Sequence, residues 1–281
     1  PAALPPVRPS ARASPAPQHS AMNQLAALLW DVDGTLAETE RDGHRVAFNQ
    51  AFADCGLSWR WDEVDYGDLL AVAGGRRRLL RYMAQRPDAP ALPDERQALA
   101  TRVHTLKNRH YGELVRAGVI TLRPGVRELV DAARSAGVRL AVTTTTSRVN
   151  LEVLLQTQFG PKWRGVFEVT VCAAEAGADK PDPAIYQRAL ALLQLPALSC
   201  LAIEDSTGGA AAARAADVPV LVTRSHYFAH ATIDGAIAIG PGLHTRQGWT
   251  PALRPDGSGR GVDLDDLRHW HAAMDLVSQF D

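Results

Sequence analysis

The stretch Leu25-Ala-Ala-Leu-Leu-Trp30, followed at once by Asp31-Val-Asp-Gly-Thr35, decides which fold the sequence predicts. A short, continuous apolar run is typical of a strand buried on both faces, and the Asp-Gly pair marks the turn that ends it. Similar runs recur at 138–143, 167–172, 200–203, 218–222 and 236–239. Such strands occur in parallel sheets that helices cover on both sides.

The segments between these strands have the apolar spacing of helices. They cover residues 124–136, 148–158, 183–193 and 208–216. Strands that alternate with helices predict an α/β fold built on a doubly wound, Rossmann-like parallel sheet. Residues 41–118 break the alternation, because they contain helical patterns at 43–55, 62–72, 75–86 and 94–117 and no convincing strand. We therefore expect an inserted all-helical cap domain.

The expected domain organisation follows from these patterns. Residues 22–40 and 119–240 form the core domain, and 41–118 form the cap. Residues 1–21 are rich in Pro, Ala and Ser with no acid, and they predict a disordered extension. This extension lacks the apolar core of a secretory signal, while a transit peptide stays open.

Residues 241–281 predict a loop followed by a helix packed on the core. Asp263 is the expected N-cap of that helix. The apolar stripe of the helix consists of Leu264, Leu267, Trp270, Met274 and Val277.

The composition excludes several classes of protein. A chain of 281 residues that is 46% hydrophobic can bury a large core. With 30 Lys and Arg against 31 Asp and Glu, it has no basic field for nucleic acid or for a membrane surface. Its 3 scattered cysteines indicate a reducing compartment and no zinc site. We expect a monomer that binds a small molecule.

Polar motifs follow four of the predicted strands, where open α/β sheets bind ligands. Asp31 and Asp33 suit a nucleophile and a proton-transfer group, although an Asp-Gly turn is also common at a strand end. The run Thr143-Thr-Thr-Thr-Ser147 offers hydroxyl and N–H groups for an anion, or simply caps the next helix.

The other two motifs supply charges. Lys180, in Lys180-Pro-Asp-Pro183, can bind a phosphate oxygen or can be a solvated loop lysine. Glu204 and Asp205 close an apolar strand, where two acids are costly without a cation. With Asp31 they form an oxygen-ligand set suited to Mg²⁺.

Taken in this order, the four motifs resemble those of the haloacid-dehalogenase-like (HAD) phosphohydrolases over about residues 22–240. A narrower resemblance, to the CbbY-like members, rests on four further stretches. These are 31–40 with His44-Arg-Val-Ala-Phe-Asn49, Asp65-Tyr66, Gly74-Gly75 with the basic residues after it, and Ser225-His-Tyr227. The resemblance implies a Mg²⁺-dependent sugar-phosphate phosphatase. The best-known activity of that subgroup removes a phosphate from xylulose 1,5-bisphosphate, which inhibits Rubisco.

The resemblance also implies roles for the core residues. Asp31 attacks phosphorus to form an aspartyl-phosphate, and Asp33 first protonates the leaving oxygen and then activates water. Thr144 binds the phosphate through its hydroxyl, and Lys180 balances its charge. The implied Mg²⁺ site consists of Asp31, the carbonyl of Asp33, Asp205 and Glu204, the last as a ligand or as a support for the ligands.

The substrate contacts are expected from the cap and from one neighbouring loop. Glu40 and Tyr66 are candidates for the sugar, and Thr145 adds a backbone N–H. Gly75, Arg76 and Arg78 are candidates for a second phosphate, since they begin a helix that carries guanidinium groups, or they form a solvated helix face. The subgroup has lysine at position 76 and an acid at 77, whereas this chain has arginine at both.

Other functions stay open at this stage. A phosphoglycolate phosphatase or a β-phosphoglucomutase-like phosphotransferase shares the four core motifs. A non-catalytic sugar-phosphate-binding regulator is a different class, which intact motifs disfavour. The expected location is a bacterial cytoplasm, with the plastid stroma as the alternative.

Overall fold

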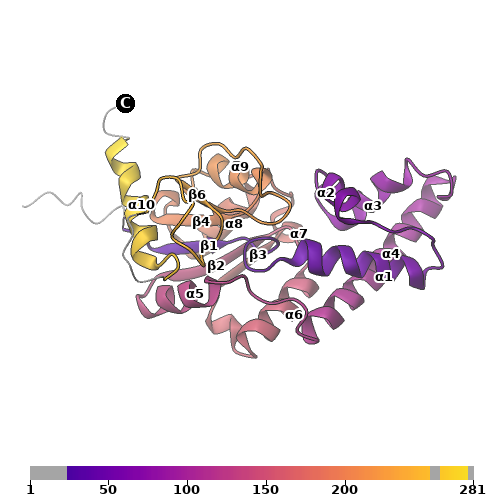
Figure 1. Cartoon of the computed structure of the whole chain (residues 1–281), viewed down its shortest axis with the longest axis horizontal. Coiled ribbons are helices and arrows are strands. Elements are labelled where there is room, and N and C mark those ends of the chain that lie inside the picture. The colour runs from indigo at the N-terminus through magenta and orange to yellow at the C-terminus, as the bar shows by residue number, and fades with distance from the viewer. Residues whose placement is uncertain (1–23, 254–259, 278–281) are drawn as a thin grey trace, which may run out of the picture.

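The structure is a computed structural model that describes residues 24–253 and 260–277. It has two lobes, one built around a sheet and one made of helices (Figure 1). The predicted extension at 1–21 lies outside the described residues, as does the side chain of Val277. In the described part of the chain, no helix is both long enough and apolar enough to cross a membrane.

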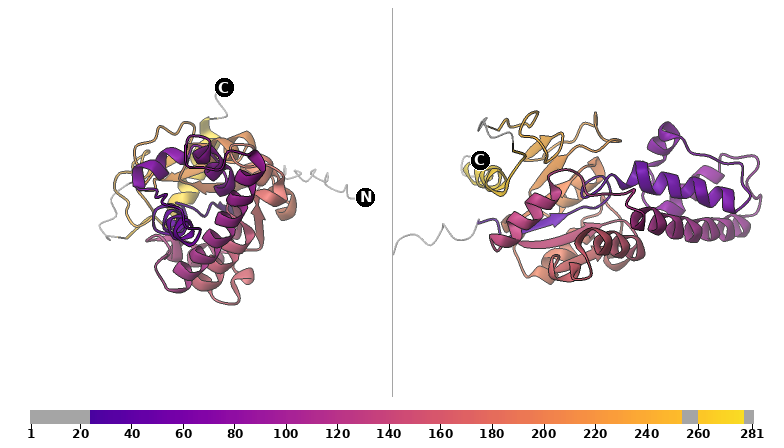
Figure 2. Two further views of the ribbon diagram at one scale, coloured as in Figure 1. Left: turned by 90° about the vertical axis from the view of Figure 1, so that its right-hand side faces the viewer. Right: turned by 60° about the horizontal axis from the view of Figure 1, so that its bottom comes forward.

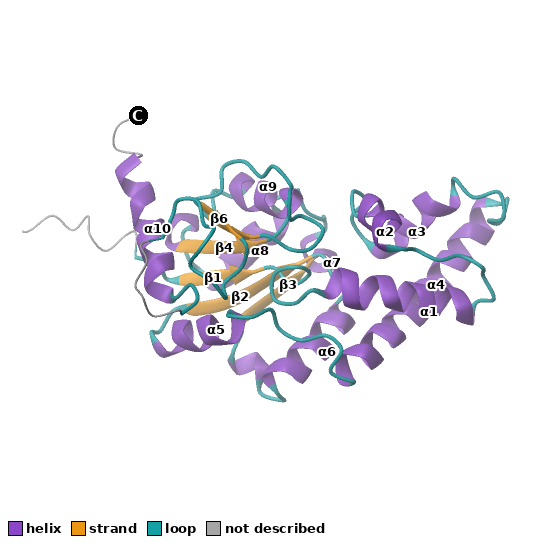
Figure 3. Ribbon diagram, viewed as in Figure 1, coloured by secondary structure: helices purple, strands orange, loops and turns teal. Residues whose placement is uncertain are grey.

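One parallel sheet forms the first lobe and confirms the predicted doubly wound α/β fold (Figure 3). Its strands are β1 (Ala27–Trp30), β2 (Arg139–Thr144), β3 (Val169–Cys172), β4 (Cys200–Glu204), β5 (Val220–Thr223) and β6 (Ala238–Gly240). Their order is β3-β2-β1-β4-β5-β6. Trp30 of β1 pairs with Val142 of β2 and with Ile203 of β4. The polar residues that follow these strands therefore meet at one edge.

Burial on both faces explains why the strands are apolar without a break. Along β1, Leu28 and Trp30 face one helical layer, and Ala27 and Leu29 face the other. The first layer consists of α5 (Val126–Ser135), α6 (Arg148–Phe159) and α10 (Leu264–Val277), and the second of α8 (Ala184–Leu193) and α9 (Thr207–Ala215). A single turn, α7 (Ala173–Ala176), follows β3.

Helix α10 packs through the first part of its apolar stripe. Leu264, Leu267 and Trp270 are buried, and the Trp270 ring lies 4.9 Å from that of Trp249. Asp263 Oδ1 accepts hydrogen bonds from the N–H groups of residues 265 and 266, at 3.0 Å each. This carboxylate caps the helix as an N-cap residue does.

The second lobe is the helical cap region. It contains α1 (Arg45–Asp54), α2 (Glu63–Leu69), α3 (Gly75–Met83) and α4 (Pro93–Arg116), and the described residues place no strand in it. Figure 2 shows these helices extending away from the sheet. Aromatic rings fill their own core, where Trp61 lies 4.7 Å from Phe48 and 4.9 Å from Phe52.

The first cap helix differs from the expected 43–55. It is preceded by a π-helical turn, η2 (Glu40–His44), before α1 begins. Wide turns of this kind are frequent at functional sites. Here the turn brings His44 back to the loop that follows β1, where it contacts Asp33.

The two lobes are joined by two crossings that lie side by side. Ala37 on the way into the cap forms an antiparallel bridge with Leu122 on the way back. The next residue, Arg123, donates its backbone N–H to the Leu36 carbonyl at 2.8 Å.

Candidate active site

Three buried carboxylates meet at the carboxyl edge of the sheet. Asp31 directly follows β1, Glu204 is the last residue of β4, and Asp205 comes next. One oxygen from each lies within 4.8 Å of the others, and all three side chains are buried. The sequence predicted these three residues together as an oxygen-ligand set.

Lys180 lies against this cluster. Its Nζ donates to Asp31 Oδ1 (2.7 Å), to Glu204 Oε1 (2.6 Å) and to the Thr143 carbonyl at the end of β2 (2.8 Å). Burial opposes the charge of the lysine, but Asp31 and Glu204 outweigh it and hold the pKa of Lys180 well above its usual value. The ammonium is therefore a fixed positive charge beside the predicted nucleophile.

One ammonium does not balance three carboxylates. Burial raises the pKa of Asp31 to about 7, with Lys180 lowering it and Glu204 raising it further. Burial and the charge of Asp31 also raise the pKa of Asp205 well above its ordinary range. Both pKa values are raised first by burial of the carboxylate and then by the negative charge of its neighbours.

The donor set fits a metal cation. Oxygen ligands suit the hard divalent ions. Glu204 Oε1 binds Lys180 and the hydroxyl of Tyr186, whereas the buried Oε2 has no hydrogen-bond partner within the described residues. This orphaned oxygen and the excess charge are what a bound cation would satisfy, so the cluster could bind a metal.

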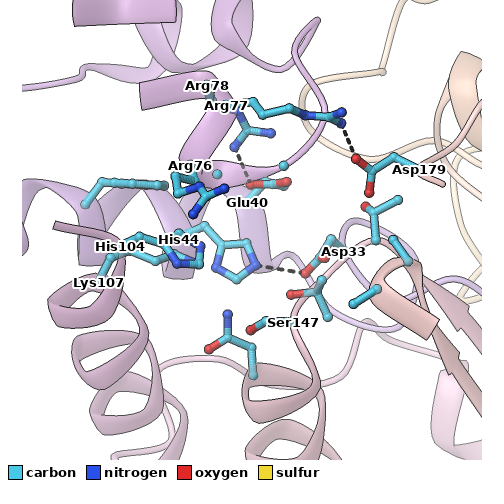
Figure 4. A pocket seen from close by; sticks show the side chains of 18 of the residues that line it. Asp33, Glu40, His44, Arg76, Arg77, Arg78, His104, Lys107, Ser147 and Asp179 are labelled. Atoms are coloured by element: carbon cyan, nitrogen blue, oxygen red, sulfur yellow. Dashed lines mark hydrogen bonds and ion pairs between the residues drawn. The ribbon is translucent and has the colours of Figure 1, made fainter. Parts of the chain in front are cut away.

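The side chain of Asp33 is not part of this cluster and faces the cap instead. Asp33 Oδ1 accepts from Thr39 Oγ1 (2.5 Å) and lies 3.1 Å from His44 Nε2 (Figure 4). Burial raises the pKa of Asp33, but His44 and the hydrogen bonds from His44 and Thr39 outweigh burial and leave it below its ordinary value. His44 was not among the residues predicted for the site, although it belongs to a stretch that carries the CbbY-like resemblance.

The threonines and the serine at the end of β2 differ in exposure, because some are buried and others line a cavity. Thr144 is buried, and its Oγ1 accepts from the Thr146 N–H (3.1 Å). Thr145, Thr146 and Ser147 line a cavity of about 510 Å³ that opens between the lobes.

The cap contributes the opposite wall of that cavity. The predicted substrate residues Glu40, Tyr66, Gly75, Arg76 and Arg78 all line it. Figure 4 shows Glu40, Arg76 and Arg78 among the side chains of this wall. They come from η2, α2 and the start of α3, with the backbone at Gly74 in the left-handed region (φ +83°) where α3 begins. The structure thus brings the cap candidates to the same space as Asp33 and Thr145.

The three arginines at the start of α3 are not equivalent. Arg78 is buried and donates to the Tyr66 hydroxyl (2.6 Å), which in turn donates to Glu40 Oε2 (2.5 Å). Arg77 forms an ion pair with Asp179 of the core lobe. Arg76 has no hydrogen bond or ion pair with any described residue. Of the three guanidinium groups, that of Arg76 is available to a ligand.

Two further basic residues, His104 and Lys107 of α4, line the cavity, and neither was predicted from the sequence. Lys107 is 4% exposed, and its Nζ lies 5.5 Å from the Phe48 ring and 5.4 Å from the Tyr111 ring. Burial lowers the pKa of Lys107 to about 8. Burial is also the main cause that lowers the pKa of His104 to about 4, and the charge of Lys107 adds to it. Lysine is rare in this sequence, and that rarity was the one feature that could have marked Lys107 as a candidate site residue.

Comparisons with known proteins agree with this fold. Residues 25–217 match the family model of the haloacid dehalogenase-like hydrolases, and the chain belongs to that family. Protein CbbY of Cupriavidus necator is 43% identical over 247 residues, which are 88% of this chain and 97% of that protein. Protein CbbY of Rhodobacter capsulatus is 43% identical and covers 73% of this chain and 87% of its own length.

Solved structures show to which members of the hydrolase family this chain is similar. CbbY from Rhodobacter sphaeroides in complex with phosphate matches with a TM-score of 0.70 and 39% identity, covering 76% of this chain and 92% of that one. A variant of that protein, crystallised with xylulose 1,5-bisphosphate, matches equally well. Within the hydrolase family, this chain is a CbbY-like phosphatase.

Proposed function

We propose that this protein removes one phosphate from a sugar bisphosphate, xylulose 1,5-bisphosphate or a close analogue, by way of an aspartyl-phosphate on Asp31. One observation carries the proposal. Asp31, Thr144 and Lys180 are buried behind the core wall of the cavity, and Asp33, Thr145 and Asp179, which lie within two residues of them in the chain, line that wall. The cap side of the same cavity presents Arg76 and Lys107. Two separated groups of charge suit a ligand with two phosphates.

Mg²⁺ is the metal we assign to the acidic cluster. Asp31, Glu204, Asp205 and the carbonyl oxygen of Asp33 are the ligands in this proposal. The observed carboxylate cluster and the orphaned Glu204 Oε2 support it. When bound, the ion supplies positive charge to the phosphate oxygens and lowers their repulsion of the carboxylates.

The first chemical step forms the covalent intermediate. Asp31 Oδ attacks phosphorus, the P–O bond to the sugar breaks, and Asp33 gives its proton to the leaving oxygen. The negative charge of a bound phosphate opposes the ionisation of Asp33, so substrate binding favours the protonated form that this step needs. Lys180 and the Thr144 hydroxyl hold the charge of the transferring group.

The second step releases phosphate. Asp33, now a carboxylate, takes a proton from water while the water oxygen attacks phosphorus. The bond between phosphorus and Asp31 breaks, which restores the Asp31 carboxylate and yields inorganic phosphate. The contacts from His44 and Thr39 hold Asp33 toward the cavity for both steps.

The cap sets specificity in this proposal. We assign residues 41–118 to the cap and 22–40 with 119–240 to the core. The Thr145 backbone N–H and Gly75, at the start of α3, also face the substrate. The chain Arg78–Tyr66–Glu40 presents the Glu40 carboxylate to a sugar hydroxyl, and Arg76 and Lys107 receive the second phosphate. Residues that already bond one another are pre-organised, which lowers the entropy cost of binding.

A phosphate-release panel tests the proposal. The substrates are xylulose 1,5-bisphosphate, ribulose 1,5-bisphosphate, phosphoglycolate and glucose phosphates, each with and without Mg²⁺. We expect Mg²⁺-dependent release and a preference for a bisphosphate of about tenfold or more, roughly 1.4 kcal/mol. If phosphoglycolate is the best substrate, the proposal is contradicted and a phosphoglycolate phosphatase is favoured. If an isomerised product appears in place of phosphate, the proposal is contradicted and a mutase is favoured.

Two variants separate catalysis from binding. Asp31→Asn should abolish turnover while the folded protein still binds the sugar phosphate. Asp131→Asn makes the same chemical change on the exposed side of α5 and should leave turnover intact. Near-normal turnover by Asp31→Asn would refute the nucleophile, and binding without hydrolysis in the unmodified protein would favour a regulator.

The proposal includes a monomer that works in a bacterial cytoplasm. Cys55, Cys172 and Cys200 are all free thiols, which suits a reducing compartment. Size-exclusion chromatography with light scattering tests the oligomeric state.

A further inference from the structure

Arg123 occupies the point where the chain returns from the cap. Its backbone N–H donates to the Leu36 carbonyl at 2.8 Å, beside the bridge between Ala37 and Leu122. Its side chain is 11% exposed and lies among the ends of the strands. Neither the proposed chemistry nor the substrate contacts use this guanidinium.

The guanidinium holds three separate segments of backbone. Nη1 donates to the carbonyls of Gly34 and Thr223 (3.1 Å for the latter) and to Thr223 Oγ1 (3.1 Å). Nη2 donates to the carbonyls of Arg224 (2.6 Å) and Pro241 (3.3 Å). Arg123 therefore ties the loop after β1 to the ends of β5 and β6, which a smaller point charge cannot do with the same geometry.

Two of these segments form the walls around Asp205. Ser225 Oγ donates to Asp205 Oδ2 at 2.5 Å. Gly34 lies close to both residues, because an added Cβ there would fall 2.7 Å from Asp205 Cγ and 3.0 Å from Ser225 Cβ. Since Arg123 fixes the carbonyl of Gly34 and that of the residue before Ser225, it sets the space that the Asp205 carboxylate occupies.

We propose that Arg123 is a positioning residue that holds Asp205 for metal binding and links this carboxylate to the crossing into the cap. The inference rests on the proposed function, because it takes the acidic cluster as the metal site. A partner that orients metal ligands contributes about 10- to 100-fold to metal affinity or activity. A residue that only stabilised the fold would leave the metal affinity of the folded protein unchanged.

Mn²⁺ binding, followed by electron paramagnetic resonance, tests the inference without relying on turnover. We expect Arg123→Gln to raise the Kd for Mn²⁺ by about 10- to 100-fold and Arg123→Lys by less. At saturating metal, kcat should fall while KM for the sugar phosphate stays within about threefold, because Arg123 touches no substrate.

Arg127 on α5 offers a matched control. Its guanidinium also donates to a backbone carbonyl, that of Gln158, and stacks 4.1 Å from the centre of the Phe159 ring, away from the site. Arg127→Gln should lower thermal stability and bind Mn²⁺ like the unmodified protein. Equal losses of Mn²⁺ affinity in the Arg127 and Arg123 variants would overturn the inference.

A double variant keeps the test decisive if Arg123→Gln does not fold. Ser225→Ala removes the hydroxyl that binds Asp205, and it should weaken Mn²⁺ binding by itself. If Arg123 acts through the same carboxylate, Arg123→Lys with Ser225→Ala should lose less than the product of the single effects. If the effects of the Arg123 and Ser225 substitutions on the Kd for Mn²⁺ simply multiply, or if folded Arg123 variants bind Mn²⁺ normally, the inference is overturned while the proposed metal site stands. No Mn²⁺ binding by the unmodified protein overturns the proposed metal site as well.

Discussion

Arg77 of the cap forms an ion pair with Asp179 of the core, the residue directly before Lys180 (Figure 4). Both side chains line the cavity and join its two walls. Because Asp179 neutralises Arg77, arginine at position 77 does not add a free positive charge for the substrate to those of Arg76 and Lys107.

Changing one partner of this ion pair, so that like charges face each other, should open the cavity. Exposed pairs contribute about 0.2–1 kcal/mol, so Arg77→Asp or Asp179→Arg should raise KM roughly two- to fivefold through lost attraction. The double exchange should recover most of the loss, because the opposite charges face each other again. Steady-state kinetics at low and at high salt measure the effect, which salt should reduce.

The ion pair between Arg164 and Glu152 is the control for that exchange. Its side chains are 67% and 41% exposed, and both residues lie outside the residues that line the cavity. Reversing Arg164 should leave KM unchanged. A double exchange at 77 and 179 that is as impaired as the single variants would show that the pair does not hold the two walls together.

Arg76 should decide between one phosphate and two. It is the arginine of its run without a hydrogen bond or ion pair among the described residues, and it lines the cavity. Arg76→Gln should lower kcat/KM for a bisphosphate by about tenfold or more, roughly 1.4 kcal/mol, and leave a monophosphate nearly unaffected. Equal losses for both substrates in parallel assays would contradict this role.

Lys107 should give substrate binding a pH dependence. Burial lowers its pKa to about 8, so the ammonium is charged below that pH and neutral above it. The second phosphate ionisation, near pH 6, is complete in this range. We therefore expect KM for a bisphosphate to rise between pH 7.5 and 9.

Lys107→Arg isolates that titration. Its guanidinium stays charged across the range, so the rise in KM should vanish, whereas Lys107→Met should have a high KM at every pH. The comparison of KM between variants at each pH removes the contribution of other titrating groups. The same rise in KM in Lys107→Arg as in the unmodified protein would contradict the role of Lys107.

Two adjacent glycines in α9 should respond in opposite ways to alanine. A Cβ at Gly209 would collide with the Glu204 carboxylate, which cannot retreat while it holds Lys180. Gly209→Ala should cost about 1–3 kcal/mol of stability and lower kcat by tenfold or more. A Cβ at Gly208 meets nothing within 4 Å, so Gly208→Ala should be neutral or stabilising by up to about 1 kcal/mol. Urea unfolding and steady-state kinetics on both variants check this contrast.

The elements of the sheet could be predicted because each strand is buried on both faces. Trp30 at the end of β1 and Ile203 near the end of β4 close apolar runs, and acids follow directly. A parallel sheet brings such ends to one edge, so the grouping of Asp31 with Glu204 and Asp205 follows from the pattern alone.

The cap side of the cavity could not be predicted in the same way. Whether Arg76, Arg77 or Arg78 is free depends on Asp179 and Tyr66, which reach α3 only through the tertiary fold. Lys107 lies in a long helix, where local spacing does not distinguish a buried lysine from a solvated one. Its pairing with the aromatic rings of the cap is visible only in the structure.

The bridge between Ala37 and Leu122 has an evolutionary consequence. The chain leaves the sheet lobe and returns to it through neighbouring residues. For the sheet, the whole cap is therefore equivalent to a short hairpin between two paired residues. A different insertion grafted between these two positions leaves the register of β1 against β2 untouched. Substrate preference can therefore diverge by exchange of one contiguous module, provided that the new module keeps the contacts that Thr39 and His44 make with Asp33.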